Sequence, residues 1–278
     1  MSYKKVLTIQ DISCVGQCSL TVALPILSAA GMETCILPSA VLSTHTGGFG
    51  KPAIRSLSDF IPEAALHWQQ QQISFQAFYT GYLGSIPLIE QAMELARQIA
   101  STGGKILIDP AMADHGKLYS GFDADYVQAM KQLCAGADVL LPNLTEACLL
   151  TDTPYPNSYD EAFVREILEK LHTLGAKSVV LTGIGYRPGH TGVVISDMGQ
   201  LDYYAHPMLP RSFHGTGDIF ASAFTGCYLA GHSMTRAAAM AADFAYECIR
   251  VTQDDPTHWY GTKLQCALPF LAKQLYGR

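Results

Sequence analysis

The sequence reads HGTGD at residues 214–218, immediately before a long apolar helical run. Two glycines around a threonine at a helix start let backbone N–H groups converge on one point, where the helix dipole adds positive potential. Because a carboxylate would repel a phosphate bound there, Asp218 needs another partner. If it faces an alcohol while the amides of Gly215, Thr216 and Gly217 face a phosphoryl group, the segment supplies a general base and an anion hole for phosphoryl transfer.

A simpler interpretation of the same residues stays open, in which Asp218 only caps the helix, a position that aspartate favours.

Two other nucleotide-binding patterns are absent. The stretch Gly47–Lys51 resembles a P-loop but lacks its spacing and the Ser or Thr after the lysine. No G-x-G-x-x-G follows the first predicted strand, which disfavours a Rossmann oxidoreductase.

Short apolar or β-branched runs alternate with helical patterns along the chain. This alternation predicts an α/β fold whose sheet is mainly parallel and buried on both faces. The predicted strands are Val6–Gln10, Thr34–Leu37, Gln76–Thr80, Lys105–Asp109, Val139–Leu141 and Ser178–Thr182. Beyond them, Gly192–Ser196 and Leu201–His206 are separated by a four-residue turn and predict an antiparallel hairpin at the sheet edge.

Helix ends are marked by residue type. The segment Ser158–Glu161 matches a capping box before a periodic run, and Gly175 follows that run as a predicted C-cap. Two Ala-rich helices are predicted over residues 217–230 and 233–250. No repeat, low-complexity segment or Pro/Gly linker divides the chain, so residues 1–278 are expected to form a single domain.

Composition narrows the class of partner. The 278 residues carry a formal charge of -6, which disfavours nucleic acid or an anionic membrane and favours a small molecule. The eight cysteines include no CxxC pair, and no apolar run is long enough for a signal or membrane segment. A soluble, cytoplasmic protein is therefore expected.

Four segments together resemble the ribokinase-like superfamily and, within it, the pyridoxal kinases. They are the Gly-Thr-Gly-Asp motif, the segment Asp109–Tyr119, the Pro-Asn-x-x-Glu-Ala element at residues 142–147 and the Ser-x-His-Thr stretch at residues 43–46. The resemblance implies a three-layer α/β/α fold and an ATP-dependent kinase that phosphorylates the 5'-hydroxymethyl group of pyridoxal, pyridoxine or pyridoxamine. It also implies Mg²⁺ with ATP, a monovalent cation as a further candidate, and a homodimer.

The resemblance assigns the nucleotide side of the site. Asp109 and Glu146 are expected near the phosphates and their metal, with Glu146 acting through water because Mg²⁺ keeps several of its own waters. Asn143 would fix that loop, and Thr182 and Gly183 would meet the phosphates. A solvated strand-end aspartate and a first-turn helix glutamate are the alternatives for the two acids.

For the substrate ring, the resemblance points to Asp11, His45, Thr46 and Tyr82. A pyridine ring with a phenolic hydroxyl needs an aromatic or apolar wall and a few polar groups that fix its orientation. Asp11 stands where pyridoxal kinases are expected to carry serine, which leaves the preferred vitamer open. His45 as a surface histidine and Tyr82 as an ordinary core aromatic are the alternatives.

Competing functions share parts of this pattern. Hydroxymethylpyrimidine kinase has the same fold and reaction, and the HGTG stretch echoes that subgroup. It typically carries a Gly-rich Ser/Asp segment after its first strand and often cysteine at the position of Asp218, and the chain has neither. A sugar kinase would need an early Gly/Asn-rich motif and a separate lid sheet. A non-catalytic nucleotide sensor would gain nothing from a base beside the phosphates.

Overall fold

The computed structural model describes residues 4–277, which cluster into two compact units. The first unit combines the chain up to Ala77 with the chain from Leu209 onward, and the second is Phe78–Met208. The expectation of a single domain stays a prediction. None of the helices within residues 4–277 has the length and apolar character that crossing a membrane requires.

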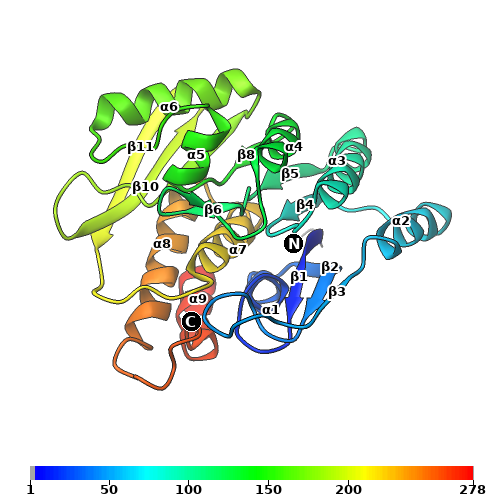
Figure 1. Cartoon of the computed structure of the whole chain (residues 1–278), viewed down its shortest axis with the longest axis horizontal. Helices are drawn as coiled ribbons and strands as arrows, with labels where there is room; N and C mark the ends of the chain where they lie inside the picture. The colour runs from blue at the N-terminus through cyan, green and yellow to red at the C-terminus, as the bar shows by residue number, and fades with distance from the viewer. Residues whose placement is uncertain (1–3, 278) are drawn as a thin grey trace. The chain divides into compact units, whose positions relative to one another are not determined.

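The first unit contains three strands in the order β1-β2-β3 and five helices. Strand β1 pairs in parallel with β2, and β2 pairs antiparallel with β3. Helices α7, α8 and α9 lie side by side in Figure 1, and α1 packs against β1, β2 and α7. The elements are β1 (Lys5–Ser13), α1 (Leu20–Ala29), β2 (Glu33–Leu42), β3 (Ile54–Ser56), α2 (Phe60–Gln70), α7 (Thr216–Leu229), α8 (Met234–Arg250) and α9 (Leu264–Tyr276).

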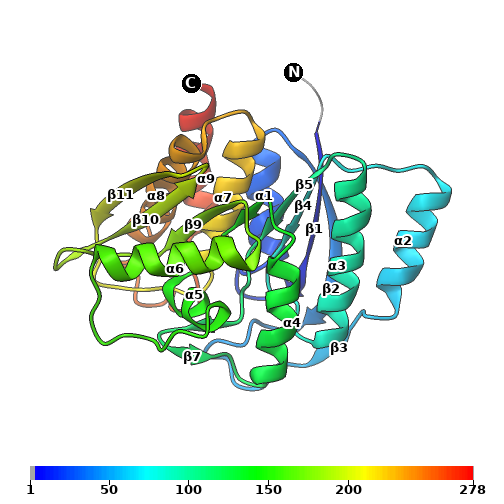
Figure 2. The same cartoon turned by 90° about the horizontal axis from the view of Figure 1, so that it is seen from above.

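The second unit contains a sheet in the order β11-β10-β9-β8-β5-β4, and Figure 2 shows helices α3, α4 and α6 along one side of it. Strands β5, β8 and β9 are parallel, whereas β10 runs antiparallel to both β9 and β11. A small separate hairpin is formed by β6 and β7. The elements are β4 (Ala77–Thr80), α3 (Ile86–Ser101), β5 (Lys105–Ile108), β6 (Ala113–Asp114), β7 (Lys117–Leu118), α4 (Ala124–Cys134), β8 (Val139–Leu140), α5 (Leu144–Leu150), α6 (Glu161–Leu174), β9 (Ser178–Thr182), β10 (His190–Asp197) and β11 (Gln200–Pro207).

The α/β class, the mainly parallel strands and the antiparallel hairpin are thus confirmed. Two local predictions are wrong. Helix α6 is capped by Asp160, whose Oδ1 accepts the Phe163 N–H at 2.9 Å, and not by Ser158. The intervening Tyr159 is used elsewhere, because its hydroxyl accepts the Gly185 N–H at 3.0 Å. Strand β2 is not buried on both faces, since Ile36 is 38% exposed.

Candidate active site

Asp218 lies in the first turn of α7, whose N-cap is Gly215. Gly215 has a φ of 81°, and a Cβ there would lie 2.7 Å from the carbonyl oxygen of Gln17, so only glycine fits. A Cβ on Gly217 would meet nothing within 4 Å. The first N–H groups of a helix have no acceptor within the helix. The start of α7 thus has a left-handed glycine and free space beside Gly217, and the anion site formed by its amides stays a prediction.

The Asp218 carboxylate is half-buried, and its Oδ2 accepts the backbone N–H of Ser19 at 3.0 Å. Burial destabilises the charged form and raises the pKa of Asp218 to about 6, with a further increase from the negative charge of Asp11 and an opposing effect of the Ser19 N–H. A carboxylate whose pKa lies just below neutrality is ionised at pH 7 and still binds a proton well, which suits a general base.

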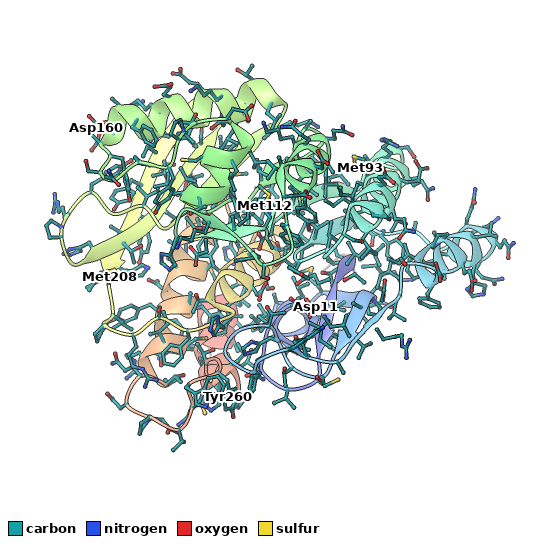
Figure 3. The ribbon with its side chains drawn as sticks, in the orientation of Figure 1. Asp11, Met93, Met112, Asp160, Met208 and Tyr260 are labelled. Atoms are coloured by element: carbon teal, nitrogen blue, oxygen red, sulfur yellow. The ribbon has the colours of Figure 1, made fainter. Side chains whose placement is uncertain are left out.

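Asp11 lies on β1, as labelled in Figure 3, and is only 4% exposed. The Ser13 hydroxyl donates to its Oδ2 at 3.1 Å. Burial is the main reason that the pKa of Asp11 is raised, and hydrogen bonds from Ser19 and Ser13 counteract it. The structure therefore brings two of the predicted residues, Asp11 and Asp218, within electrostatic reach of each other.

His45 is buried and held at both ring nitrogens. Its Nδ1 accepts the Gly47 N–H at 3.0 Å, so its Nε2 carries the proton and donates to the carbonyl oxygen of Tyr260, labelled in Figure 3, at 2.6 Å. Burial is the largest cause of the lowered pKa of His45. The alternative of a surface histidine is wrong, because the side chain is 5% exposed. The neighbouring Thr46 is exposed.

The glycine-rich loop at residues 46–50 packs on aromatic rings. The Phe49 ring lies 5.0 Å from the His45 ring and 4.7 Å from the Trp259 ring, measured between centroids. A Cβ on Gly48 would lie 2.6 Å from Trp259, and one on Gly47 would lie 2.6 Å from His214. These glycines are therefore needed for close contact between loop and rings, and the loop is tied to Trp259 and Tyr260.

In the second unit, Asn143 and Glu146 form a true capping box at the start of α5. Asn143 Oδ1 accepts the Glu146 N–H at 3.0 Å, and Glu146 Oε2 accepts the Asn143 N–H at 2.9 Å. Glu146 Oε1 also accepts the N–H of Met112, labelled in Figure 3, at 3.0 Å. Burial raises the pKa of Glu146 to about 7 despite these donors. The capping alternative for Glu146 is therefore real, and its metal role through water stays a prediction.

Asp109 follows β5 and is 8% exposed, with its Oδ1 accepting the Ala111 N–H at 3.1 Å. Asp109 and Glu146 both act electrostatically on the buried Cys134 thiol, whose pKa is raised mainly by burial, so the two acids lie in one neighbourhood. Within residues 4–277, no three His, Cys, Asp or Glu side chains gather closely enough to ligate a metal directly. Asp109 and Glu146 as holders of a hydrated Mg²⁺, partly through water, therefore stay a prediction.

Thr182 and Gly183 lie where β9 ends beside the end of β8. The Thr182 N–H donates to the carbonyl oxygen of Pro142 at 2.9 Å, and a bridge joins Thr182 to Asn143. Gly183 is exposed, has a φ of 76° and would place a Cβ in open space. The structure thus gathers Asn143, Glu146, Thr182 and Gly183 at the carboxyl ends of adjacent parallel strands, the edge at which such sheets bind ligands.

Tyr82 is half-buried in a stack of rings. Its ring lies 5.5 Å from that of Phe122 with 26° between the planes, and Phe122 lies 3.7 Å from Tyr126 with 7° between the planes. Tyr82 therefore belongs to an aromatic wall of the second unit. This packing agrees with a ring-binding role and with the core alternative alike.

Sequence reasoning missed several contributors. Ser19, which donates its N–H to Asp218, follows no recognisable motif. Met112 donates its backbone N–H to Glu146, a contact that the type of its side chain does not reveal. The rings of Trp259 and Tyr260 lie more than 200 positions from the loop that they contact. A Gly-rich loop with a histidine before it is the one signal that could have suggested such a partner.

Comparison with known proteins identifies the family. The family model described as phosphomethylpyrimidine kinase matches residues 28–262. The chain belongs to this family. A curated relative, the hydroxymethylpyrimidine/phosphomethylpyrimidine kinase of Bacillus subtilis, is 29% identical over 180 residues, which cover 63% of this chain and 64% of that enzyme. The chain thus spans less than two thirds of that relative's length, and it spans 30% of a bifunctional thiamine biosynthesis protein of Geobacter sulfurreducens.

Two solved structures match over nearly the whole chain. The pyridoxal kinase of Lactobacillus plantarum is 34% identical, with a TM-score of 0.88 and coverage of 97% of both chains. A Bacteroides thetaiotaomicron protein with the provisional name phosphomethylpyrimidine kinase, in a crystal form with pyridoxal, is 34% identical, with a TM-score of 0.92 and coverage of 97% and 96%. The predicted resemblance to pyridoxal kinases, the ribokinase-like fold and the kinase class are confirmed at the level of the family.

Proposed function

We propose that this member of the phosphomethylpyrimidine kinase family transfers the terminal phosphoryl group of ATP to the 5'-hydroxymethyl group of pyridoxal, pyridoxine or pyridoxamine. The observation that carries the proposal is Asp218, a half-buried carboxylate in the first turn of α7 with its pKa raised to about 6. A full-length match to the pyridoxal kinase of L. plantarum supports this choice of substrate.

The proposed mechanism divides the work between base and amides. Asp218 accepts the proton of the substrate hydroxyl as its oxygen attacks the phosphorus atom. The N–H groups of Gly215, Thr216 and Gly217 stabilise the charge on the transferring phosphoryl group. Thr216 is fixed for this role, because its hydroxyl donates to the carbonyl oxygen of Phe213 at 3.2 Å. The left-handed Gly215 lets the chain enter α7 without a side chain in the way.

Asp109 and Glu146 would hold a hydrated Mg²⁺, which when bound neutralises phosphate charge. Asn143 orients Glu146 through the capping box, and Thr182 and Gly183 are proposed as phosphate contacts at the end of β9. Asp11, His45, Thr46 and Tyr82 are proposed as contacts of the substrate ring. A monovalent cation, a homodimer and a cytoplasmic location stay predictions.

Hydroxymethylpyrimidine is the second candidate substrate, favoured by the description of the matching family and by the B. subtilis relative. It presents the same hydroxymethyl group on a six-membered nitrogen ring, so the machinery around Asp218 would serve both. The two candidates differ only in the ring contacts.

Purified protein with Mg-ATP is expected to phosphorylate pyridoxal or pyridoxine with a higher kcat/KM than hydroxymethylpyrimidine. A substrate panel, read by ADP release and by mass spectrometry of the product, measures the ranking. The opposite ranking would assign the chain to the pyrimidine substrate, and ADP release without a phosphorylated product would contradict both.

Turnover is expected to fall as the pH decreases through about 6, because protonation of Asp218 removes the base. The measurement is the logarithm of kcat/KM plotted against pH between 5 and 8.5, in which the decrease below about pH 6 is the acidic limb. A rate that stays level from pH 5 to 8 would exclude a base with the raised pKa of Asp218.

A further inference from the structure

Two buried acids and one strained serine form a connected group in the first unit. Ser19 is 4% exposed and has φ 53° and ψ −126°, a backbone conformation that residues other than glycine rarely adopt. Its N–H donates to Asp218 Oδ2 at 3.0 Å, its backbone bridges to Ile12, the residue after Asp11, and its hydroxyl lies near enough to Asp11 to favour the ionised carboxylate. Ser19 thus links Asp218 of α7 to the end of β1 that carries Asp11.

The strain at Ser19 is maintained by its surroundings. A backbone bridge joins Ser19 to Ile12 of β1, and the N–H groups of Val22 and Ala23 donate to the Ser19 carbonyl oxygen at 3.0 and 2.9 Å. These contacts fix the residue from both directions. A conformation of this kind persists where the neighbouring structure requires it, often at functional sites.

We propose that Asp11 is a positioning residue for the reaction, a buried acid next to Ser19 whose negative charge sets the pH at which Asp218 becomes active as the base. The inference rests on the proposed function, because it assumes that Asp218 is the base. It assigns Asp11 a role besides contact with the substrate ring.

The charge arrangement around Asp218 supports this assignment. Like charges close together resist ionising together, so a nearby carboxylate raises the affinity of Asp218 for a proton. The other titratable groups near the pair are the Cys18 thiol, whose pKa is raised mainly by burial, and the ring of His45, which is neutral as judged from its hydrogen bonds. His214 contacts the His45 ring at 5.3 Å. Among these titratable side chains, Asp11 is thus the acid that lies near Asp218.

The experiment compares Asp11→Asn with wild type through the pH dependence of kcat/KM for pyridoxal and Mg-ATP. Loss of the neighbouring charge is expected to move the acidic limb to lower pH and to remove one ionisation from the profile. Asp59→Asn is the matched control, because Asp59 is an exposed acid of the same unit whose side chain caps nothing. Its limb is expected to coincide with that of wild type.

Ser19→Ala provides a second variant that retains both charges. Without the hydroxyl, Asp11 binds a proton more readily, so its charge is lost earlier during acidification and the limb again moves to lower pH, by less than in Asp11→Asn. A limb that stays in place in both variants, or a loss of rate that is equal at every pH, would reduce Asp11 to a structural or ring-contacting residue.

A direct titration separates this inference from the proposed function. The carboxyl carbon of Asp218, labelled with ¹³C and assigned by its absence in Asp218→Asn, is followed by NMR in wild type and in Asp11→Asn. A titration midpoint that falls in Asp11→Asn supports the coupling whatever the substrate is, and an unchanged midpoint overturns it. Full turnover in Asp218→Asn would instead overturn the catalytic role of Asp218.

Discussion

Replacing Asp218 with asparagine is expected to lower turnover by about 10²- to 10⁴-fold, the usual contribution of a general base. The asparagine Oδ1 can still accept the Ser19 N–H, so the first turn of α7 keeps its geometry and ATP binding is retained. Steady-state ADP release gives the rate, and calorimetry or nucleotide fluorescence gives the affinity. A variant with wild-type turnover would remove Asp218 from the mechanism.

The same substitution is expected to stabilise the folded protein at pH 7, because burial makes the ionised form of Asp218 unfavourable there. The folded-state pKa of Asp218, about 6, is raised above the ordinary 3.8. Its contribution to stability is therefore complete below about pH 4 and is lost as the pH rises through 6. At pH 7 asparagine avoids this cost, which amounts to at most about 3 kcal/mol. Urea unfolding at pH 7 and at pH 4 measures the gain, which should shrink at the lower pH; a variant less stable at pH 7 would contradict it.

Replacing Gly215 with alanine is expected to destabilise the protein by about 2 to 4 kcal/mol. The backbone there has a φ of 81°, and the added Cβ would lie 2.7 Å from the carbonyl oxygen of Gln17. Since a backbone atom cannot rotate away, the start of α7 must shift, and turnover should fall at least about tenfold because the anion-hole amides shift with it. Chemical denaturation and kcat measure the two effects.

Gly217→Ala is the matched control for that prediction. A Cβ at residue 217 meets nothing within 4 Å, and alanine favours a helix by about 1 kcal/mol over glycine. This variant should be at least as stable as wild type. Equal stability of Gly215→Ala and Gly217→Ala would show that the left-handed cap is not required.

The sequence predicted the fold well because its strands and helices follow strong local patterns. The six predicted strands, the β10–β11 hairpin and helices α7 and α8 occur within a few residues of their expected bounds. The predictions failed where two local signals competed, as at Ser158 and Asp160, and where burial depends on the neighbouring element, as for β2. Helices α2, α4 and α9 were not foreseen.

The candidate site residues were predicted from sequence motifs. A motif identifies a side chain, but it does not reveal which distant residues surround that side chain in the fold. Burial is the main cause of the raised pKa of Asp218, Asp11 adds to it and the Ser19 N–H opposes it, and both residues lie about 200 positions away in the chain. Local patterns carry no information about such contacts. Glu146 illustrates the opposite case, because its helix position and one of its donors, the Asn143 N–H, could be recognised from the Asn-x-x-Glu spacing.

The contact between Trp259 and the loop at residues 46–50 gives the protein a built-in optical reporter. The chain has two tryptophans, and the other one, Trp68, lies on α2 against Phe75. With Trp68 changed to phenylalanine, emission would come from the indole that touches Gly48 and Phe49. Any displacement of that loop by a substrate would then alter the fluorescence of the unlabelled enzyme in real time.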